Sequence, residues 1–378
     1  MFKKILSVLL IIIMSMPMAV FANEPIALSC ESAILMDAKT GTVIFEKNAD
    51  TPLPPASITK VMTMLIIMEE INAGKLNYND IVTASSRAKS MGGSTIFLDD
   101  GEKMSVYDLL KGIAVASAND ACVAMAEHIS GSVEAFVQRM NEKAKSLGMK
   151  NTNFINTNGL DADGHVSSAR DVAIMSAELL KYEEIFNFTT IWTDSLRNGE
   201  FGLANTNKLI RFYEGATGLK TGSTDKAGCS VSATAKRDGL HLIAVVMKAP
   251  TSNDRFADAK TLLNYGFANY HLWQNNDTEK KIGKVRVEKG ASGEVGVRME
   301  SEMAALIKKS DKGGEELRIY LEESVKAPIK AGDILGRAVC LLGEKEISAS
   351  NLVATDDVEK ISLFSLYKNL ICMLIGAK

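Results

Sequence analysis

The sequence lacks any long block of charge of one sign, and this absence excludes the surface that a nucleic-acid-binding chain needs. Its 43 basic and 46 acidic side chains leave a formal net charge of -3. Because nucleic acids are held largely through their phosphates, a chain without a basic stripe is not expected to bind them. Any partner must therefore be selected by a local site.

Closely spaced cysteines are missing as well. No two cysteines follow the Cys-x-x-Cys pattern and no histidines cluster, so we expect no metal, no cofactor and no disulfide framework. Cys122 and Cys229 lie in apolar segments rich in small residues, which favours buried free thiols. The cysteines are odd in number and widely dispersed along the chain: Cys30, Cys122, Cys229, Cys340 and Cys372.

The chain does have the length and the apolar content for two domains, with 378 residues of which 46% are hydrophobic. Its first 22 residues carry Lys3 and Lys4, then an apolar run from Ile5 to Val20 and small Ala22. This order predicts a cleaved signal peptide over residues 1–22. An uncleaved signal anchor is the alternative, although the run is shorter than the roughly 20 residues that span a bilayer. In either case we expect the rest on the extracytoplasmic side of a bacterial membrane.

Residues 23–272 mix strand and helix patterns, which predicts an α+β domain whose sheet is closed by the first and last strands. Ser32 to Glu46 is typical of a hairpin, and the proline-rich run Thr51 to Ala56 excludes helix before Ser57. An apolar helix pattern then extends from Ile58 to Ile71. Further helices are expected at 106–129, 133–147, 169–185 and 254–270, and strands at 229–235 and 240–247.

After residue 272 the pattern changes to short alternating runs punctuated by glycine, which predicts a small β-sandwich-like domain over residues 273–356. Residues 357–378 form an amphipathic helix pattern too interrupted to span a bilayer. Such a helix can lie in the membrane interface or pack on the second domain, and after a signal peptide we favour the membrane.

Ser57-Ile58-Thr59-Lys60 is a Ser-x-x-Lys motif whose context is chemically informative. Only Ser57 lies at the first turn of a strongly apolar helix, where helix amides favour negative charge on its oxygen. The spacing places Lys60 one turn further on the same face. An N-capping serine with a surface lysine is the alternative, because the spacing recurs at Ser86/Lys89, Ser223/Lys226 and Ser365/Lys368.

Two further motifs carry groups suited to proton transfer and to binding a peptide. Ser117-Ala118-Asn119 is the sole Ser-x-Asn of the chain and offers a hydroxyl for proton transfer and an amide for a peptide backbone, or else a polar helix cap. Lys220-Thr221-Gly222 precedes Ser223 and offers a cation, a donor and a position without a side chain along a strand edge. The other copy, Lys39-Thr40-Gly41, is assigned to the hairpin turn and receives no catalytic role.

These three motifs in this order resemble the penicillin-binding protein and serine β-lactamase superfamily. The similarity to low-molecular-mass D-alanyl-D-alanine carboxypeptidases runs from about Ala33 to Tyr270, and the β domain and tail match that family's architecture. It rests further on Asn158-Gly159-Leu160-Asp161, Gly164-His165, Ala169-Arg170-Asp171, Asn205-Thr206-Asn207-Lys208 and Gly218-Leu219-Lys220-Thr221-Gly222.

The resemblance implies a β-lactamase/transpeptidase-like domain and a catalytic role for five residues. Ser57 would form an acyl-enzyme with Lys60 as its base, and Ser117 would relay a proton to the departing D-alanine. Asn119 would hold the peptide, and Lys220 would support the relay electrostatically. The substrates would be peptidoglycan stem peptides ending in D-Ala-D-Ala, with β-lactams as covalent inhibitors.

Substrate binding is implied for the third motif and its surroundings. The backbone amides of Ser57 and Ser223 would form the oxyanion hole, and Thr221 and Arg255 would bind the terminal carboxylate beside Lys220 and Gly222. Some family members carry histidine where this chain has Ser223, which leaves the details of carboxylate recognition open. A solvated helix arginine is the alternative for Arg255.

Three other functions remain as alternatives. His165 with Asp161 or Asp171 suggests a Ser-His-Asp triad, but no motif links it to Ser57. Glu183 to Asn187 superficially resembles the glutamate loop of a serine β-lactamase, although a helix end is the better interpretation. A catalytically silent wall-binding scaffold is disfavoured because the motif residues are intact.

Overall fold

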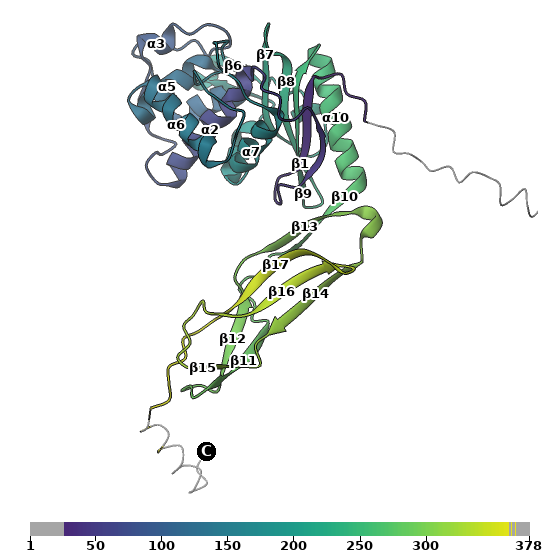
Figure 1. The fold of residues 1–378 in the computed structure, drawn as a ribbon. Helices are drawn as coiled ribbons and strands as arrows, with labels where there is room; N and C mark the ends of the chain where they lie inside the picture. The colour runs from purple at the N-terminus through teal and green to yellow at the C-terminus, as the bar shows by residue number, and fades with distance from the viewer. Residues whose placement is uncertain (1–25, 363, 365–366, 368–378) are drawn as a thin grey trace, which may run out of the picture.

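The computed structural model describes residues 26–362 together with 364 and 367. The predicted signal peptide at 1–22 and most of the predicted helix at 357–378 lie outside this range. The predicted helix start is wrong: residues 357–362 are described and are not helical, because Val358 and Lys360 form isolated β-bridges with Ile329 and Gly290. The α+β fold class is confirmed: a mixed helical and sheet domain is followed by a β domain that extends away from it (Figure 1).

One five-stranded antiparallel sheet organises the first domain, in the order β2-β1-β9-β8-β7. It confirms the prediction that the first and last strands share a sheet, and it leaves β7 at one edge. The predicted hairpin is also confirmed, with Lys39-Thr40-Gly41 in the turn between β1 and β2. The strands are β1 (Ser32–Asp37), β2 (Val43–Lys47), β7 (Ala216–Thr224), β8 (Gly228–Arg237) and β9 (Leu240–Ala249).

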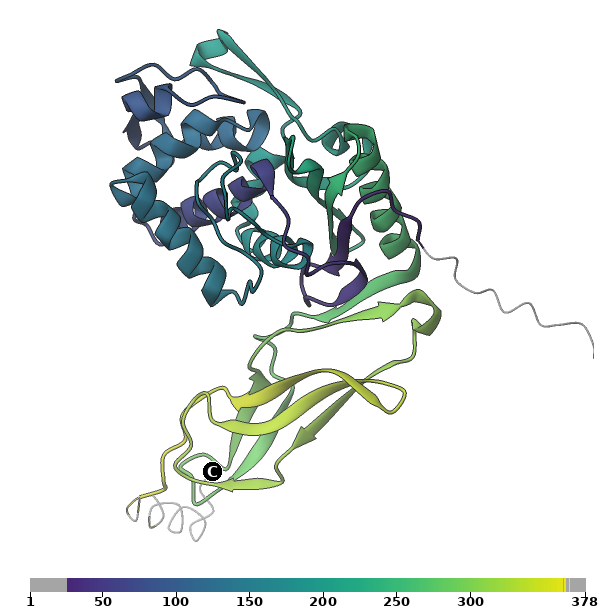
Figure 2. The ribbon, with the colours of Figure 1, turned by 45° about the horizontal axis from the view of Figure 1, so that its top comes forward.

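Helices cover both faces of this sheet, because strand side chains alternate between two cores. Ile243, Val245 and Met247 of β9 join the core shared with the helical lobe. The intervening residues of the strand, such as Ala244, join the core beneath α10 (Ser252–Asn269). Figure 2 shows this arrangement, with α10 on one side of the sheet and the helical lobe on the other.

The helical lobe surrounds α2 (Lys60–Asn72), which is buried from Lys60 to Met68. Around it lie α4 (Val106–Lys111), η2 (Gly112–Ala116), α5 (Asn119–Ser130), α6 (Val133–Ser146) and α7 (Ala169–Leu179). Short elements complete the domain: η1 (Ala56–Thr59), β3 (Ile81–Thr83), α3 (Ser86–Lys89), β4 (Lys103–Ser105), η3 (Glu183–Ile185), α8 (Phe186–Thr189), β5 (Thr193–Leu196), η4 (Arg197–Gly199), β6 (Phe201–Ala204) and α9 (Leu209–Phe212).

Two predicted helices are shorter than expected. The continuous helix predicted at 106–129 is wrong, because the chain breaks at Ser117, whose φ of 65° is left-handed. The break is compensated by a tertiary contact in which the Asn119 amide donates to the Ser94 carbonyl at 2.7 Å. The helix predicted at 169–185 ends at Leu179 and a separate turn follows at Glu183. The helical periodicity of apolar residues in the sequence continues through both breaks, so it did not reveal them.

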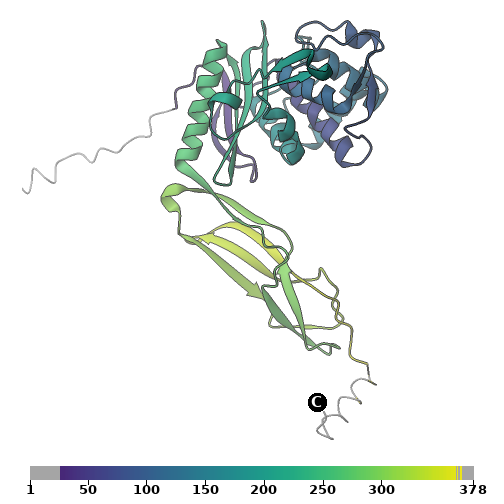
Figure 3. The same cartoon turned by 180° about the vertical axis from the view of Figure 1, so that it is seen from behind.

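The second region is built mainly from strands and extends lengthwise from the end of α10 (Figure 3). A two-stranded sheet pairs β10 (Tyr270–Asn275) with β13 (Met303–Lys308), and a six-stranded sheet has the order β14-β16-β17-β12-β11-β15. The remaining elements are β11 (Gly283–Glu288), β12 (Glu294–Met299), η5 (Lys309–Asp311), β14 (Glu315–Leu321), β15 (Ser324–Lys326), β16 (Ile334–Leu342) and β17 (Lys345–Ala354).

Candidate active site

Ser57 and Lys60 form the centre of the site. Ser57 lies in the 3-10 turn η1 directly before α2, close to the predicted helix start. The Lys60 ammonium donates to Ser57 Oγ at 2.8 Å, to Asn119 Oδ1 at 2.6 Å and to the Asn158 carbonyl at 2.6 Å. These three acceptors use all three ammonium hydrogens, so the nitrogen is held in one position beside the serine.

Burial of two lysines governs the electrostatics of the site. Lys60 is fully buried, and the loss of hydration lowers its pKa to about 8. Burial also holds the pKa of Lys220 well below its usual range, and the nearby Lys60 charge lowers it further. Because burial penalises the charged form, the neutral amine of Lys60 is accessible near physiological pH.

The second motif is positioned by the helix break. Ser117 lies between η2 and α5, has a left-handed backbone conformation and is buried. Asn119 is the first residue of α5. While Asn119 Oδ1 accepts from Lys60, its Nδ2 donates to the Gly92 carbonyl at 2.7 Å. Both ends of the amide are thus engaged, which fixes its orientation.

The third motif lies on the edge strand β7, which packs against η1. A Cβ at Gly222 would lie only 2.9 Å from the Ser57 nitrogen and 3.0 Å from the Pro55 carbonyl oxygen. The sequence interpretation reserved this space for substrate, but the turn that carries Ser57 already borders it. Glycine is therefore required here for the close approach of two backbones. Thr221 donates its hydroxyl hydrogen to Thr206 Oγ1 at 2.8 Å.

Arg255 extends from α10 to the back of β7. Its Nη1 donates to the Gly222 carbonyl at 3.1 Å and to the Ser230 carbonyl at 3.4 Å, and its Nη2 donates to Ser252 Oγ. The side chain is buried, which lowers its pKa, and its Nε has no hydrogen-bond partner among the described residues. The solvated-arginine alternative is therefore wrong, and the guanidinium supports the strand that carries Gly222.

The segment between α6 and α7 contributes to the site in a way that the sequence analysis did not assign. The Asn158 carbonyl accepts a hydrogen bond from Lys60. The next residue, Gly159, lies so close to η1 that a Cβ on it would be 1.8 Å from the Ala56 carbonyl oxygen. Asp161 then accepts a hydrogen bond from Thr224 at the end of β7. In the sequence, only the Asn158-Gly159 pair indicated a tight turn. The contact of the Asn158 carbonyl with Lys60 could not be predicted, because a backbone carbonyl leaves no signature in a sequence.

The triad interpretation is wrong. His165 Nε2 lies 2.8 Å from Thr59 Oγ1, and its Nδ1 accepts from the Ile155 amide at 2.9 Å. Burial lowers the pKa of His165 to about 4, so the ring is a neutral structural group whose two nitrogens are both occupied. Asp171 accepts from the Asn151 amide and the Thr152 hydroxyl instead.

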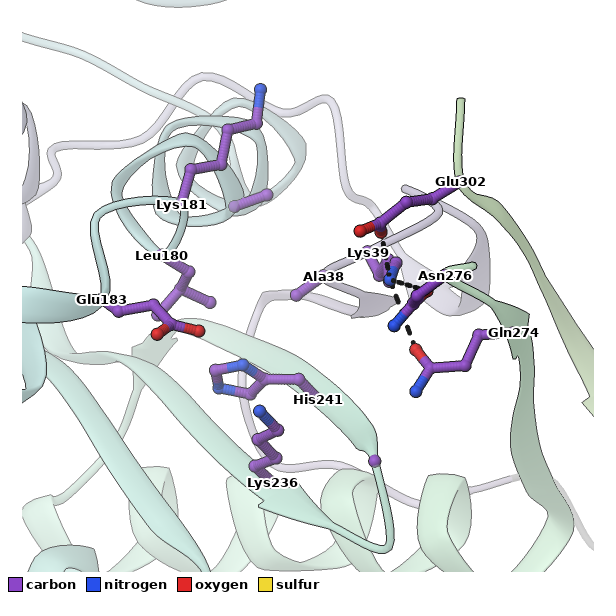
Figure 4. A pocket seen from close by; sticks show the side chains of 12 residues that line it. Ala38, Lys39, Leu180, Lys181, Glu183, Lys236, His241, Gln274, Asn276 and Glu302 are labelled. Atoms are coloured by element: carbon purple, nitrogen blue, oxygen red, sulfur yellow. Dashed lines mark hydrogen bonds and ion pairs between the residues drawn. The ribbon is translucent and has the colours of Figure 1, made fainter. Parts of the chain in front are cut away.

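Glu183 is also removed from Ser57. Residues 183–187 form η3 and the start of α8, so Glu183 begins a separate turn after α7 and does not end the helix predicted at 169–185. Glu183 lines a cavity of about 440 Å³ with His241 and Lys236, and none of the three motifs lines it (Figure 4). The cavity lies beside the contact between the two domains, where Lys39 meets Glu302.

The cysteines of the described residues lie outside the three motifs and form no disulfide. Cys30, Cys122 and Cys340 are buried and Cys229 is half-buried, all as free thiols. Among residues 26–362, no three histidine, cysteine or acidic side chains gather as a metal site would. No helix within the described part combines the length and apolar character needed to cross a bilayer.

The chain is similar to known proteins over almost its whole length. A family model described as D-alanyl-D-alanine carboxypeptidase matches residues 18–251, and a model of the penicillin-binding protein 5 C-terminal domain matches residues 267–360. D-alanyl-D-alanine carboxypeptidase DacF of Bacillus subtilis (strain 168) is 43% identical over 97% of each chain.

Solved structures agree. Penicillin binding protein 5 from Haemophilus influenzae has a TM-score of 0.78 at 33% identity, covering 89% of this chain and 99% of that one. Penicillin-Binding Protein D2 from Listeria monocytogenes, in its ampicillin-bound form, has a TM-score of 0.59 at 31% identity, covering 64% and 99%.

Fold and comparisons together define a serine-type peptidase on a transpeptidase-like scaffold. The chain belongs to the D-alanyl-D-alanine carboxypeptidase family.

Proposed function

We propose that this chain removes the terminal D-alanine from peptidoglycan stem peptides through an acyl-enzyme on Ser57. The observation that carries this proposal is the fixed Lys60 amine, 2.8 Å from Ser57 Oγ and with a pKa lowered to about 8 by burial. A serine hydroxyl needs such a base before it can act as a nucleophile.

Acylation begins when neutral Lys60 takes the Ser57 proton and the oxygen attacks the carbonyl carbon of the penultimate D-alanine. The negative charge that develops on the carbonyl oxygen is stabilised by the backbone amides of Ser57 and Ser223. The close packing of β7 on η1 at Gly222 supports this pairing, because it holds the two backbone segments together. Asn119 orients the peptide, and Thr221, with Arg255 behind the strand, recognises the terminal carboxylate.

Release of D-alanine requires a proton on its nitrogen. Ser117 donates its hydroxyl proton to that nitrogen as the carbon–nitrogen bond breaks, and it regains a proton from the Lys60 ammonium. The charge of Lys220 favours this transfer. In the second half of the reaction, neutral Lys60 takes a proton from water, the resulting hydroxide attacks the ester, and Ser57 leaves with the proton.

β-Lactams are proposed as covalent inhibitors by the same attack. The ring amide opens onto Ser57, but its nitrogen stays tethered to the acyl group and does not leave the site. The related Listeria protein D2 was solved in ampicillin-bound and cefotaxime-bound forms. Steady turnover of a β-lactam, instead of a long-lived adduct on Ser57, would favour a β-lactamase.

The test is release of D-alanine from diacetyl-L-lysyl-D-alanyl-D-alanine by the full chain. Ser57→Ala should lower kcat by at least about a thousandfold, because a nucleophile is lost. Ser86→Ala is the matched control, since Ser86 begins another Ser-x-x-Lys motif on the surface helix α3 and bonds Asp100. Equal rates for the wild type and Ser57→Ala would refute the catalytic assignment, and no release by either would leave a silent scaffold.

We further propose a division into a signal peptide (1–22), a catalytic domain (23–272), a β domain (273–356) and a membrane-associating tail (357–378). The β domain extends from α10 away from the site, which supports a spacer between the site and a surface (Figure 1). Fractionation of a chain truncated before Asp357 tests the anchor, and unchanged membrane retention would count against it.

A further inference from the structure

Phe97 is the most exposed large apolar side chain of the first domain among the described residues, and its backbone is unfavourable. Its side chain is 74% exposed and its φ is +55°. A positive φ is strained for a bulky residue without a compensating contact. Neither the exposed ring nor the positive φ stabilises the fold, so other contacts must hold Phe97 in this conformation.

A buried carboxylate imposes this conformation. Asp120, which follows Asn119 directly, accepts hydrogen bonds from the amides on both sides of Phe97, Ile96 and Leu98, at 3.0 to 3.2 Å. The side chains of Ile96 and Leu98 are themselves buried. With both neighbours anchored inward, the ring of Phe97 must point outward.

The hairpin β5–β6 locks the same loop from the other side. Arg197 donates to the carbonyls of Ile96 and Phe97 and pairs with Glu102 through two nitrogens. Its guanidinium packs on the ring of Phe201, and the Phe97 and Phe201 rings meet edge to face at 6.0 Å. Phe97 thus presents the exposed ring, and half-buried Phe201 supports it edge to face; this pair is called the aromatic platform.

This platform is continuous with the active site. Its loop supplies the Gly92 and Ser94 carbonyls that hold Asn119, and the strand of Phe201 leads to Thr206, the partner of Thr221. The chain segments whose residues bond Asn119 and Thr221 thus continue into the platform.

We infer that Phe97, supported by Phe201, binds a sugar ring of the glycan strand that carries the stem peptide. Exposed aromatic surface marks a binding site, and flat rings suit the apolar faces of sugars. Asp99 and Asp100 lie next on the loop, and both are exposed. Asp99 pairs with Lys89 at 3.0 Å, whereas Asp100 accepts, among the described residues, only from the uncharged Ser86 hydroxyl. The remaining negative charge of Asp100 disfavours a carboxylate as the occupant, whereas the sugar rings are uncharged. This inference rests on the proposed function.

The test compares kcat/KM for a free diacetyl-lysyl-D-alanyl-D-alanine peptide with that for uncross-linked glycan strands bearing pentapeptide stems. Phe97→Ala should leave the free-peptide value within about twofold and lower the glycan value about five- to tenfold through KM. Phe97→Trp should retain activity on the glycan. Phe212→Ala, which removes another exposed ring, is the control and should affect neither substrate.

Phe97→Gly separates this role from a structural one. Glycine accepts the positive φ without strain, which offsets its larger unfolded-state entropy, so this variant should stay folded with thermal stability close to that of the wild type while still losing activity on the glycan. Equal loss on both substrates, or loss on neither, would overturn the inference. Failure of the proposed function would look different, because the wild type would then release D-alanine from neither substrate.

Discussion

At the residue scale, the chemistry of this site depends on two lysines that water does not reach. Lys60 and Lys220 are both buried, and a lysine is an effective base only when its neutral form is accessible. The Ser-x-x-Lys spacing placed Lys60 next to Ser57, and this prediction is confirmed by the 2.8 Å contact between Lys60 Nζ and Ser57 Oγ. The roles assigned to Ser117, Asn119, Lys220, Thr221, Ser223 and Arg255 stay predictions.

The lowered pKa of Lys60 predicts a distinct pH dependence. Because the neutral amine is the base, kcat/KM should rise with pH through an apparent pKa of about 8. Lys60→Arg should abolish the rise, since a guanidinium is not deprotonated in this range. A pH–rate profile of D-alanine release measures this, and a flat profile from pH 6 to 10 would contradict the assignment.

The same pKa shift also affects stability, with a sign that can be worked out. The folded pKa is about 8 against 10.5 for an ordinary lysine. Between these values the unfolded chain binds more protons than the folded one, so the Lys60 contribution to the free energy of unfolding increases with pH. Below both values this contribution stays at its least favourable level.

At the element scale, the connections between helices decide the geometry of the site more than the helices do. The break at Ser117 orients α5, and the segment Asn158–Asp161 bridges Lys60, η1 and β7. Periodicity predicted the helices well, with α6 and α10 ending within two residues of the expected limits. It did not reveal either connection, because the contacts that fix them come from distant parts of the chain.

Gly159 offers the sharpest test of this segment. Gly159→Ala should lower the free energy of unfolding by about 2–4 kcal/mol, because its Cβ would collide with the Ala56 carbonyl and φ is +89°. It should also slow acylation of Ser57 by a fluorescent penicillin. Urea denaturation and the acylation rate measure the two effects.

Gly164→Ala is the matched control for that experiment. Gly164 has a similar φ of +79°, but the nearest atom to its Cβ would be Asn153 Nδ2 at 3.8 Å. This variant carries the backbone strain without the collision. It should therefore lower the free energy of unfolding by only about 1 kcal/mol and leave the acylation rate of Ser57 unchanged. Equal effects of the two substitutions would mean that contact with η1 is unimportant.

At the scale of the whole molecule, the other Lys-Thr-Gly copy joins the two domains. Lys39 Nζ contacts Glu302 at 2.8 Å, Asn276 at 3.1 Å and Gln274 at 3.3 Å, all in the second region (Figure 4). Its assignment to a hairpin turn without catalytic role agrees with this position. The turn instead supports the junction at which α10 continues into β10.

Lys39→Ala should loosen this junction without affecting catalysis. An exposed ion pair contributes about 0–1 kcal/mol, so the fold should persist while the distribution of interdomain distances broadens in small-angle scattering. D-Alanine release from the free peptide should stay within about twofold, since Lys39 is remote from Ser57. Arg87→Ala, which removes an exposed pair with Glu134 inside the first domain, should leave the scattering unchanged.

The sequence by itself determined the mixed fold, the hairpin, most helices, the order of the three motifs and the choice of Ser57 among several Ser-x-x-Lys serines. Periodicity, proline and motif order are local properties, so they can be read along the chain. Tertiary structure alone decided that the Asn158 carbonyl accepts from Lys60 and that Gly159 packs against the turn of Ser57. It also decided that His165 bonds Thr59 and that Gly222 packs on the same turn as Gly159. Those relationships join segments up to 165 residues apart, as between Ser57 and Gly222, and they depend on backbone atoms and close packing that no residue pattern encodes.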